Sequence, residues 1–309
     1  MKVRREPRGL HFYDRQNGLH VLFDECPIPT HECDEGPAVT SIALTNICDL
    51  SCPFCYAPKS RHTLSTDEVV GWCKELAALG TLEVAVGGGE PTLYPNLPEL
   101  CRTIWSETNM GVSITTHGQH LGNELVNALA GSVSLIRISI DAPEPHYSLI
   151  RRRPLQIAVE NVRRLAGRIP FAVNTVINRA TLPYLDELAI LVRELAAVDW
   201  LLLPEVRSGE FTLTDLEWQA LDRWISEHRF DFELRTAAEA AGHLSGPFLF
   251  ENMSEDYAHI SADGYLRRRS YANGGVPLRG NTVLNALREL RRDQRVAQTC
   301  FEGLRFVPH

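Results

Sequence analysis

The stretch "TLEVAVGGGEPTLYPNLPELCRTIWSET" (81–108) places an apolar run, a glycine-rich turn and an amphipathic segment one after another. "TLEVAVGG" (81–88) has the β-branched composition of a buried strand, and "NLPELCRTIWSET" (96–108) spaces its apolar residues as one face of a helix does. The turn between them contains "GGGEP" (87–91). This stretch therefore predicts a strand–turn–helix unit, from which parallel sheets are built.

The same alternation continues on both sides of this stretch. Five further apolar runs predict strands at 38–46, 111–116, 134–141, 171–178 and 199–206. Amphipathic stretches lie between them, at 65–79, 122–131, 154–167 and 182–198. Strands that alternate with helices imply a parallel sheet with right-handed crossovers. Because six units are too few for a closed eight-stranded barrel, we predict an α/β fold with a partial, curved (βα)6 TIM-type barrel.

The composition excludes several classes of protein. The chain has 309 residues, and its formal net charge of -8 does not favour a nucleic-acid partner. The basic start "MKVRREPRGLHFYD" (1–14) is followed by no apolar stretch, so it does not resemble a signal peptide. No segment approaches the roughly 20 apolar residues that cross a bilayer. We therefore expect a cytoplasmic protein that does not associate with membranes.

The flanks of the repeating region predict two smaller parts. Residues 1–36 form an N-terminal extension with a β-hairpin around Asn17-Gly18, and residues 37–210 form the (βα)6 core. Residues 211–309 form a C-terminal extension with a capped amphipathic helix at 212–230, a turn at Asp263-Gly264 and a last helix at 282–294. We expect this C-terminal extension to cover the substrate.

A loop after the first predicted strand, "TNICDLSCPFCYAP", holds three cysteines within eight residues: Cys48, Cys52 and Cys55. In a reducing compartment, clustered thiols indicate a metal or catalysis rather than disulfides. A structural zinc site takes four ligands, and no fourth Cys or His follows at finger spacing. A [4Fe–4S] cluster usually has four cysteine ligands, so three would leave one iron open. Cys73 and Cys101 lie in helical stretches and are predicted to be core residues.

The other polar motifs also follow predicted strands. "GGGEP" (87–91) follows the second strand, "TTHG" (115–118) the third and "SIDAP" (139–143) the fourth. Parallel strands have their carboxyl ends on one face, and barrel enzymes build their active sites there. The arrangement therefore predicts an enzyme.

The spacing Cys48-x3-Cys52-x2-Cys55, with "GGGEP" after the next strand, resembles the motifs of the radical S-adenosylmethionine (SAM) superfamily. The resemblance implies one [4Fe–4S] cluster held by these three cysteines, with SAM chelating the open iron. It also implies reductive cleavage of SAM to a 5'-deoxyadenosyl radical, which abstracts hydrogen from the substrate. A flavodoxin- or ferredoxin-type electron donor is implied as well.

The resemblance covers about residues 38–206 and carries over to individual positions. It implies that SAM contacts Phe54, Gly88, Gly89, Glu90, Thr116, Ser139, Asp141, Arg151, Asn174 and Val176. Glu90 and the glycines before it would receive the amino group of SAM, and Arg151 would lie near its carboxylate. "ITTHG" has His117 where the family usually has asparagine, and we expect His117 to contact the substrate.

The C-terminal extension resembles the beginning of the SPASM extension found in peptide-modifying radical SAM enzymes. Where that extension has cysteines, this chain has Arg267, Arg268 and Arg269, so we expect a truncated extension with no auxiliary cluster. On a strand, Arg267 and Arg269 would share one face. Two interpretations of this face are open: it meets an anionic substrate, or it belongs to a solvated edge strand whose charges keep other chains from pairing with it.

Three functions are open at this point. The first, which we favour, is maturation of a ribosomally made peptide natural product (RiPP), with the leader recognised by a separate peptide-binding protein. The second is tailoring of a small molecule such as a sugar, nucleoside or amino acid. The third is an iron–sulfur binding or sensing protein without catalysis, which would not cleave SAM.

Overall fold

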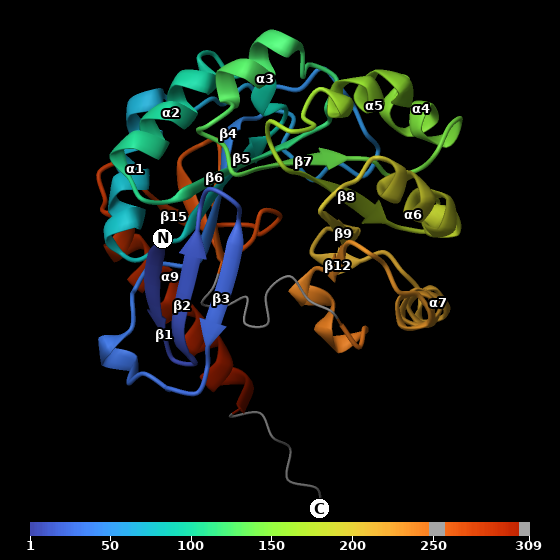
Figure 1. Cartoon of the computed structure of the whole chain (residues 1–309). Helices are drawn as coiled ribbons and strands as arrows, with labels where there is room; N and C mark the ends of the chain where they lie inside the picture. The colour runs from blue at the N-terminus through green and yellow to red at the C-terminus, as the bar shows by residue number, and fades with distance from the viewer. Residues whose placement is uncertain (247–256, 303–309) are drawn as a thin grey trace, which may run out of the picture.

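The computed structural model describes residues 1–246 and 257–302, with side chains described as far as residue 292. A ten-stranded sheet of order β12-β9-β8-β7-β6-β5-β4-β13-β14-β15 curves through the molecule (Figure 1). The six predicted strands are all present and parallel: β4 (Val39–Thr45), β5 (Glu83–Gly88), β6 (Gly111–Thr116), β7 (Leu135–Ser139), β8 (Phe171–Ile177) and β9 (Asp199–Pro204). The partial barrel predicted from the sequence is therefore confirmed.

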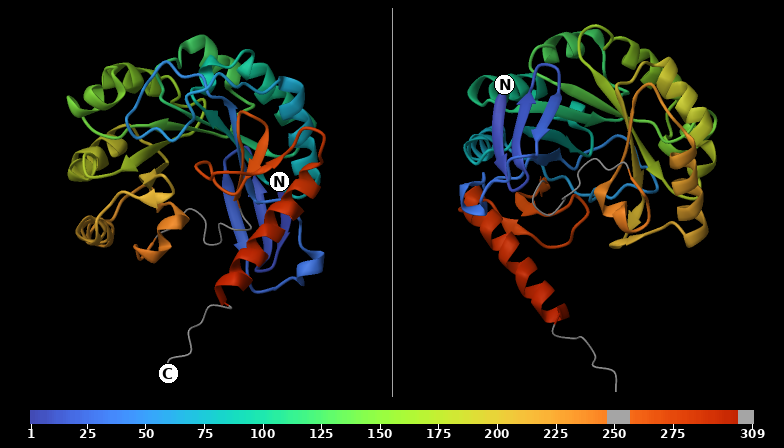
Figure 2. Two further views of the ribbon diagram at one scale, coloured as in Figure 1. Left: turned by 180° about the vertical axis from the view of Figure 1, so that it is seen from behind. Right: turned by 60° about the horizontal axis from the view of Figure 1, so that its bottom comes forward.

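Helices cover the convex face of this sheet, as Figures 1 and 2 show. They are α1 (Thr66–Ala78), α2 (Leu97–Glu107), α3 (Asn123–Leu129), α4 (His146–Arg151), α5 (Leu155–Arg163) and α6 (Leu185–Glu194). Short 3-10 turns lie at η1 (Thr30–Glu32), η2 (Pro91–Leu93) and η3 (Leu182–Tyr184). Helix α1 begins at a capping box, in which Ser65 and Glu68 satisfy each other's backbone N–H groups. The helices bury their apolar faces on the strands, so the core lies between these two layers.

The sheet extends beyond the six predicted strands at both edges. Strand β12 (Glu233–Thr236) pairs in parallel with β9, and β13 (Tyr257–Ile260) pairs in parallel with β4. Strands β14 (Tyr265–Arg267) and β15 (Val276–Pro277) follow as antiparallel neighbours, and the predicted turn at Asp263-Gly264 joins β13 to β14. Among the described residues no ladder joins β12 to β15, so the barrel stays open.

A separate three-stranded sheet of β1 (Lys2–Glu6), β2 (Gly9–Asp14) and β3 (Leu19–Phe23) packs against the amino ends of the core strands. The predicted hairpin is β2–β3, and β1 is a third strand that the sequence reading missed. Lys2 Nζ donates to the carbonyl of Thr81 at 2.6 Å, and the Tyr13 hydroxyl donates to Glu83 Oε2 at 3.3 Å. These contacts hold the N-terminal sheet against the amino end of β5.

The C-terminal part lies along both edges of the sheet. It contains α7 (Asp215–Glu227), η4 (Ala238–Gly242) and α9 (Val283–Glu302), and a small ladder of β10 (Val206–Arg207) with β11 (Glu210–Phe211) precedes it. The backbone N–H of Val283 donates to Glu75 Oε2 at 2.8 Å, which joins the start of α9 to α1. Figure 2 shows α9 running away from the sheet.

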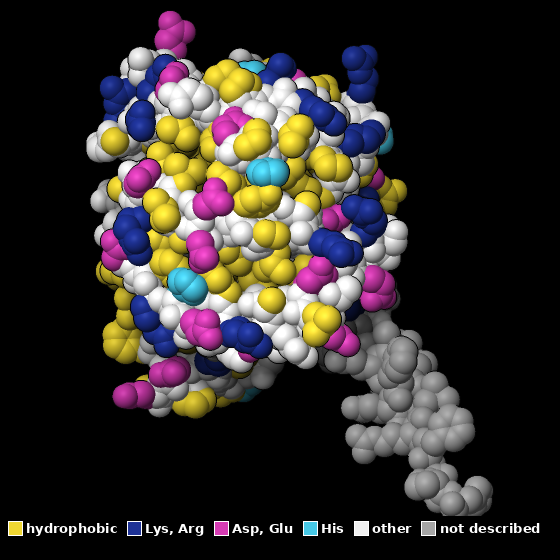
Figure 3. Space-filling view, turned by 90° about the vertical axis from the view of Figure 1, so that its right-hand side faces the viewer, with side chains coloured by type: hydrophobic (Ala, Val, Ile, Leu, Met, Phe, Trp, Pro, Cys, Tyr) yellow, Lys and Arg dark blue, Asp and Glu magenta, His cyan; other side chains and the backbone are white. Residues whose placement is uncertain are grey.

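The face that carries α4 to α7 mixes hydrophobic side chains with charges of both signs (Figure 3). Scattered exposed apolar side chains are normal on such a surface. Within the described part of the chain, no helix has the length and apolar character that crossing a membrane requires.

Candidate active site

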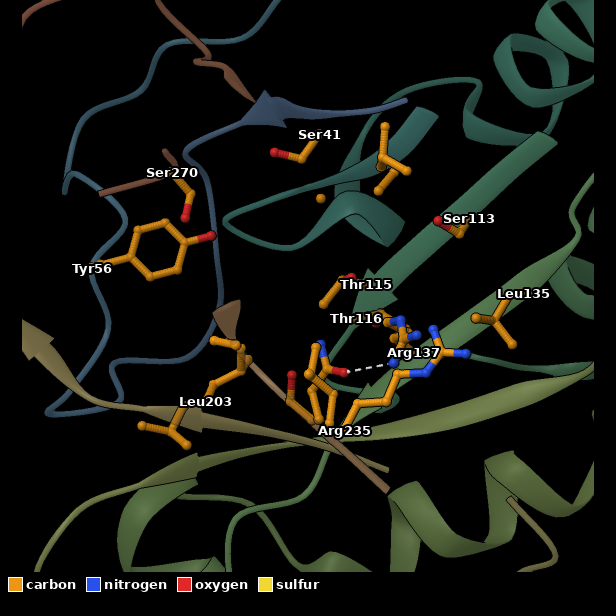
Figure 4. Close-up of a pocket in the computed structure, with 18 of the residues that line it drawn as sticks. Ser41, Tyr56, Ser113, Thr115, Thr116, Leu135, Arg137, Leu203, Arg235 and Ser270 are labelled. Atoms are coloured by element: carbon orange, nitrogen blue, oxygen red, sulfur yellow. Dashed lines mark hydrogen bonds between the residues drawn. The ribbon is translucent and has the colours of Figure 1, made fainter. Parts of the chain in front are cut away.

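The concave face of the sheet encloses a cavity of about 860 Å³. Side chains that alternate along the strands form its walls, and the cysteine loop forms its rim. Figure 4 shows its polar side chains, which come from both the core and the C-terminal part, converging on one space. A cavity of this size suits a cofactor-sized ligand.

All three cysteines of the loop after β4 line this cavity, and none of them forms a disulfide. The backbone N–H of Leu50 donates to Cys48 Sγ at 3.4 Å. Burial raises the pKa of the Cys48 thiol to about 11 and also raises the pKa of the Cys52 thiol. The thiols of Cys48 and Cys52 are therefore protonated at neutral pH, and they would become thiolates on binding a metal.

Gly88 and Gly89 are required by the close approach of two backbones. A Cβ on Gly88, whose φ is +122°, would lie 2.3 Å from the carbonyl oxygen of Thr45. A Cβ on Gly89 would lie 2.3 Å from the carbonyl oxygen of Ile47, and the Gly89 N–H donates to the Thr45 carbonyl at 2.6 Å. The glycine motif therefore holds the base of the cysteine loop. Gly87 differs, because a Cβ there would point into the cavity and meet nothing closer than 3.8 Å.

Glu90 is buried at the end of this motif and is surrounded by donors from its own chain. Its Oε1 accepts from the hydroxyls of Thr116 and Thr92, each at 2.6 Å. Its Oε2 accepts from the backbone N–H of His117 at 3.0 Å. Glu90 thus ties β5 to the end of β6. Glu90 and Thr116 were both assigned to the SAM site from the sequence, and both line the cavity.

His117 lies against the cysteine loop. Its Nε2 is 3.0 Å from Asp49 Oδ1, and its Nδ1 accepts from the backbone N–H of Gln119 at 3.1 Å. Nε2 therefore carries the proton and donates to Asp49. Burial lowers the pKa of the His117 imidazole even though Glu90 and Asp49 are close, which favours its neutral form. The exposed His120 also reaches Asp49, with Nε2 at 3.2 Å from Oδ2.

Asp141 and Arg151 form a buried ion pair in the opposite wall. Nε and Nη2 of Arg151 lie 2.7 and 2.6 Å from Asp141 Oδ2, and the N–H of Val176 donates to Oδ1 at 3.0 Å. Burial acts to lower the pKa of Arg151, but the Asp141 charge outweighs it and raises that pKa above its usual value. The guanidinium lies 5.9 Å from the centre of the Phe54 ring, within range of a cation–π contact.

Only one of the three consecutive arginines at 151–153 lines the cavity, namely Arg151. Arg152 adopts a left-handed conformation at the end of α4, and Arg153 lies 3.6 Å from Asp49. The remaining residues assigned to SAM from the sequence are Ser139, Asn174 and Val176, and all three line the cavity on β7 and β8.

Arg267, Arg268 and Arg269 are not in the cavity wall, and the prediction that Arg267 and Arg269 share a strand face was wrong. Strand β14 ends at Arg267, so the alternation does not continue through Arg268 and Arg269. Arg267 donates to the carbonyl of Ala272 at 3.0 Å, and Arg268 donates to that of Leu290 at 2.5 Å. Arg267 and Arg268 thus hold the turn after β14 and α9 in place. Arg269 lies 3.9 Å from Glu239 and donates to the Tyr271 hydroxyl at 3.5 Å, and both of these partners line the cavity.

The C-terminal extension supplies other cavity residues that the sequence reading missed. They include Arg235, Glu239, Tyr257, His259, Ser270 and Tyr271. The Ser41 hydroxyl of β4 lies 2.5 Å from the Tyr257 hydroxyl and 2.7 Å from His259 Nδ1. No local pattern indicates this cluster, because it depends on a strand pairing across more than 200 residues.

Arg137 was also missed, although a pattern for it existed. Side chains on a strand alternate between faces, so a residue two positions before Ser139 faces the same side. The structure places Leu135, Arg137 and Ser139 of β7 in the cavity wall.

The donor set fits the cofactors of the resemblance. Three free thiols share the rim of one cavity, and among the described residues lining it no fourth cysteine is present. Asp49 and His117 come within metal-binding range of Cys48, but His117 already donates to Asp49 and accepts from Gln119. The three cysteines therefore remain the predicted ligands of a cluster. The cavity beside them is lined by the Arg151 guanidinium and by the carboxylates of Glu90 and Asp141, groups that suit the carboxylate and the amino group of SAM.

The comparison with known proteins agrees with this geometry. Residues 42–191 match the Radical SAM superfamily. The AdoMet-dependent heme synthase of Methanosarcina barkeri is 27% identical, over 67% of this chain and 63% of that protein. The sporulation killing factor maturation protein SkfB of Bacillus subtilis is 29% identical, over 74% of this chain and 59% of that protein. This chain therefore spans about 60% of the length of these curated relatives.

The fold has solved counterparts. The crystal structure of Streptococcus suis SuiB bound to the precursor peptide SuiA superimposes with a TM-score of 0.68 at 16% identity, over 82% of this chain and 65% of that chain. The open parallel barrel, with three cysteines in the loop after its first core strand, is typical of proteins that bind an iron–sulfur cluster at the carboxyl ends of the strands. The match over residues 42–191, which is just under half of this chain, is to the radical SAM superfamily, whose cofactors are a [4Fe–4S] cluster and SAM.

Proposed function

We propose that this protein is a radical SAM enzyme that modifies a ribosomally made peptide. The observation that carries the proposal is the position of the three cysteines, which share the rim of a single cavity with Gly87, Glu90 and Arg151. When bound, the cluster and SAM supply a 5'-deoxyadenosyl radical able to abstract hydrogen from an unactivated carbon. The protein has to bind the cofactors, orient the substrate and exclude water.

Each wall of the cavity suits one part of this task. Cys48, Cys52 and Cys55 would hold the cluster. The Arg151 guanidinium, positioned by Asp141, would bind the SAM carboxylate, and the bare backbone at Gly87 leaves room for the cofactor beside β5.

The other assigned residues complete the proposed SAM site. Glu90 and Thr116 would orient the end of β6 around the amino group, with Gly88 and Gly89 holding the loop. Ser139, Asn174 and Val176 would face the ribose, and Phe54 would pack on the adenine.

The choice of a peptide rests on the relatives. SkfB is by its name a maturation protein for a sporulation killing factor, and SuiB was crystallised with a precursor peptide. The heme synthase is by its name concerned with another kind of molecule, so family membership alone does not fix the substrate. An electron donor of the flavodoxin or ferredoxin type and a separate leader-binding protein belong to the same proposal.

The chemistry is tested by anaerobic reconstitution. Wild-type protein should contain about four irons per chain and cleave SAM in the presence of a reductant. The variants Cys48→Ala, Cys52→Ala and Cys55→Ala should lose the iron, whereas Cys101→Ala, in the core, should retain it. Full iron content without SAM cleavage would instead indicate an iron–sulfur sensing protein.

The substrate is tested by co-expression with the short peptides encoded beside the gene, followed by mass spectrometry. A mass change in one peptide that disappears with Cys52→Ala supports the proposal. Unmodified peptides, together with consumption of a small metabolite by the same cells, would overturn the peptide assignment and favour a small-molecule enzyme.

A further inference from the structure

Two arginines from separate strands enter the inner half of the cavity, on the side of the N-terminal sheet. Arg137 comes from β7 and Arg235 from β12, and Figure 4 shows both side chains directed into the same space. They share one carboxylate. Arg137 Nη1 donates to Asp199 Oδ1 at 2.7 Å, and Arg235 Nε lies 3.2 Å from Asp199 Oδ2.

Neither guanidinium is saturated by the protein. Arg137 uses only Nη1, which also donates to Asn174 Oδ1 at 3.3 Å. Arg235 uses Nε toward Asp199 and Nη2 toward Glu233. Among the described residues, Nε and Nη2 of Arg137 and Nη1 of Arg235 have no acceptor. The two side chains are only 15% and 28% exposed, so these unused donors are largely withdrawn from bulk solvent and would gain from a ligand acceptor.

The charges around the pair leave positive charge facing the cavity. Asp199 is buried and is divided between Arg137 and Arg235. Glu233 is 57% exposed, so solvent screens its charge. Burial raises the pKa of Glu83 even though both arginines are near it, which favours its neutral form. Asp199 is therefore a single buried carboxylate that faces two partly buried guanidiniums.

We propose that Arg137 and Arg235 form an anion subsite, which holds a carboxylate of the substrate in the inner half of the cavity. This inference rests on the proposed function and names the chemistry of its substrate. Forked N–H donors match the two oxygens of a carboxylate. Ser139, in the proposed SAM site, is two residues further along β7, a rise of about 7 Å. An acidic side chain anchored at Arg137 would thus place its neighbouring carbons beside SAM.

The test is calorimetric titration of the reconstituted holoenzyme, with SAM present, using glutarate as the probe and glutaramide as its neutral counterpart. Glutarate should bind and glutaramide should not. Arg137→Gln and Arg235→Gln should each weaken glutarate binding by about tenfold or more, the usual effect of losing a hydrogen bond to a charged group. Arg193→Gln is the control, because Arg193 lies on the surface beside Asp231 and is absent from the cavity wall.

A variant that is expected to raise the affinity for glutarate distinguishes a loss of the subsite from a loss of folding. Asp199→Asn removes the carboxylate that competes for both guanidiniums, so this variant should bind glutarate more tightly than the wild type does. Equal glutarate affinity in the wild type and both arginine variants, or no binding of glutarate by the wild type, would overturn the subsite. Binding of inorganic phosphate in preference to glutarate would overturn the choice of a carboxylate.

The iron content and SAM cleavage of the same samples separate this inference from the proposed function. If Arg137→Gln and Arg235→Gln keep the iron and still cleave SAM but bind glutarate normally, only the subsite fails. If the wild type cannot cleave SAM, the proposed function fails. The glutarate affinities of the wild type and the two arginine variants then decide only whether the anion subsite exists.

Discussion

Nε2 of His117 donates to Oδ1 of Asp49 across 3.0 Å, so the residue that directly follows Cys48 is tied to the end of β6. Arg153 and His120 approach the other oxygen of the same carboxylate, at 3.6 and 3.2 Å. The His117 side chain thus anchors the loop. The local sequence does not indicate this contact, because 68 residues separate His117 from Asp49.

This anchor predicts that His117→Ala loosens the cluster site. The part-buried hydrogen bond between His117 and Asp49 is lost and the loop gains freedom, at a cost of about 1 kcal/mol in the free energy of unfolding. Iron should therefore pass to an added chelator faster than it does from the wild type. His120→Ala removes a more exposed partner of the same carboxylate and should have a smaller effect. Equal iron-release rates in all three proteins would show that the anchor does not hold the loop.

The glycine motif predicts a contrast between neighbouring positions. Gly89→Ala would force a Cβ to within 2.3 Å of the Ile47 carbonyl, so the cysteine loop must shift. Overpacking of this kind costs about 1–3 kcal/mol and here should also lower the iron content. Gly87→Ala is the matched control, because its Cβ meets nothing within 3.8 Å and should leave folding and iron content unchanged. Thermal unfolding and iron analysis of the two variants would reveal any failure of this contrast.

The buried pair of Asp141 and Arg151 predicts a large loss of stability when one partner is removed. Asp141→Ala leaves the guanidinium without its carboxylate and should cost about 3–5 kcal/mol. Arg193→Ala breaks an exposed pair with Asp231 and should leave the urea midpoint close to the wild-type value. Similar midpoints for the two variants would mean that Arg151 finds another partner.

The core cysteines predict an outcome opposite to that of the loop cysteines. Cys73 and Cys101 are fully buried between α1 and α2, and burial raises the pKa of the Cys101 thiol to about 12. Cys73→Ala and Cys101→Ala should each cost about 1 kcal/mol in unfolding free energy. Their iron content should match that of the wild type, and a loss of iron would contradict their assignment to the core.

His259 predicts a dependence of stability on pH. Burial lowers the pKa of its imidazole from 6.5 to about 3. Between these values the unfolded chain binds a proton that the folded chain does not, so stability is lost as the pH falls through this window. The decrease in unfolding temperature from pH 7.5 to pH 5.5 should be smaller in His259→Gln than in the wild type. A parallel decrease in both proteins would assign the acid sensitivity to other groups.

The strands and motifs could be predicted from the sequence because each depends on local periodicity. β-Branched runs gave the six core strands, and the motifs after them had to share one face of the sheet. The cavity position of Arg137 followed the same alternation as Ser139 and could have been predicted. Arg267 and Arg269 were misplaced because the length of β14 is set by the turn after it, in which Arg268 reaches the carbonyl of Leu290.

The parts that could not be predicted depend on contacts between distant segments. Strand β12 finds its place beside β9, and β13 finds its place beside β4, through ladders whose partners no local pattern specifies. The same holds for Ser41 and Tyr257, which become neighbours only when β13 joins the sheet.

The pairing of β13 with β4 also bears on the order in which the molecule is assembled during synthesis. Ser41 and His259 are 218 residues apart, and translation at about 5–20 residues per second separates their appearance by roughly 10–40 s. Throughout that interval one edge of the strand that leads into the cysteine loop has no partner. Unpaired edges attract other chains, so nascent protein is most exposed to aggregation before residue 260 leaves the ribosome.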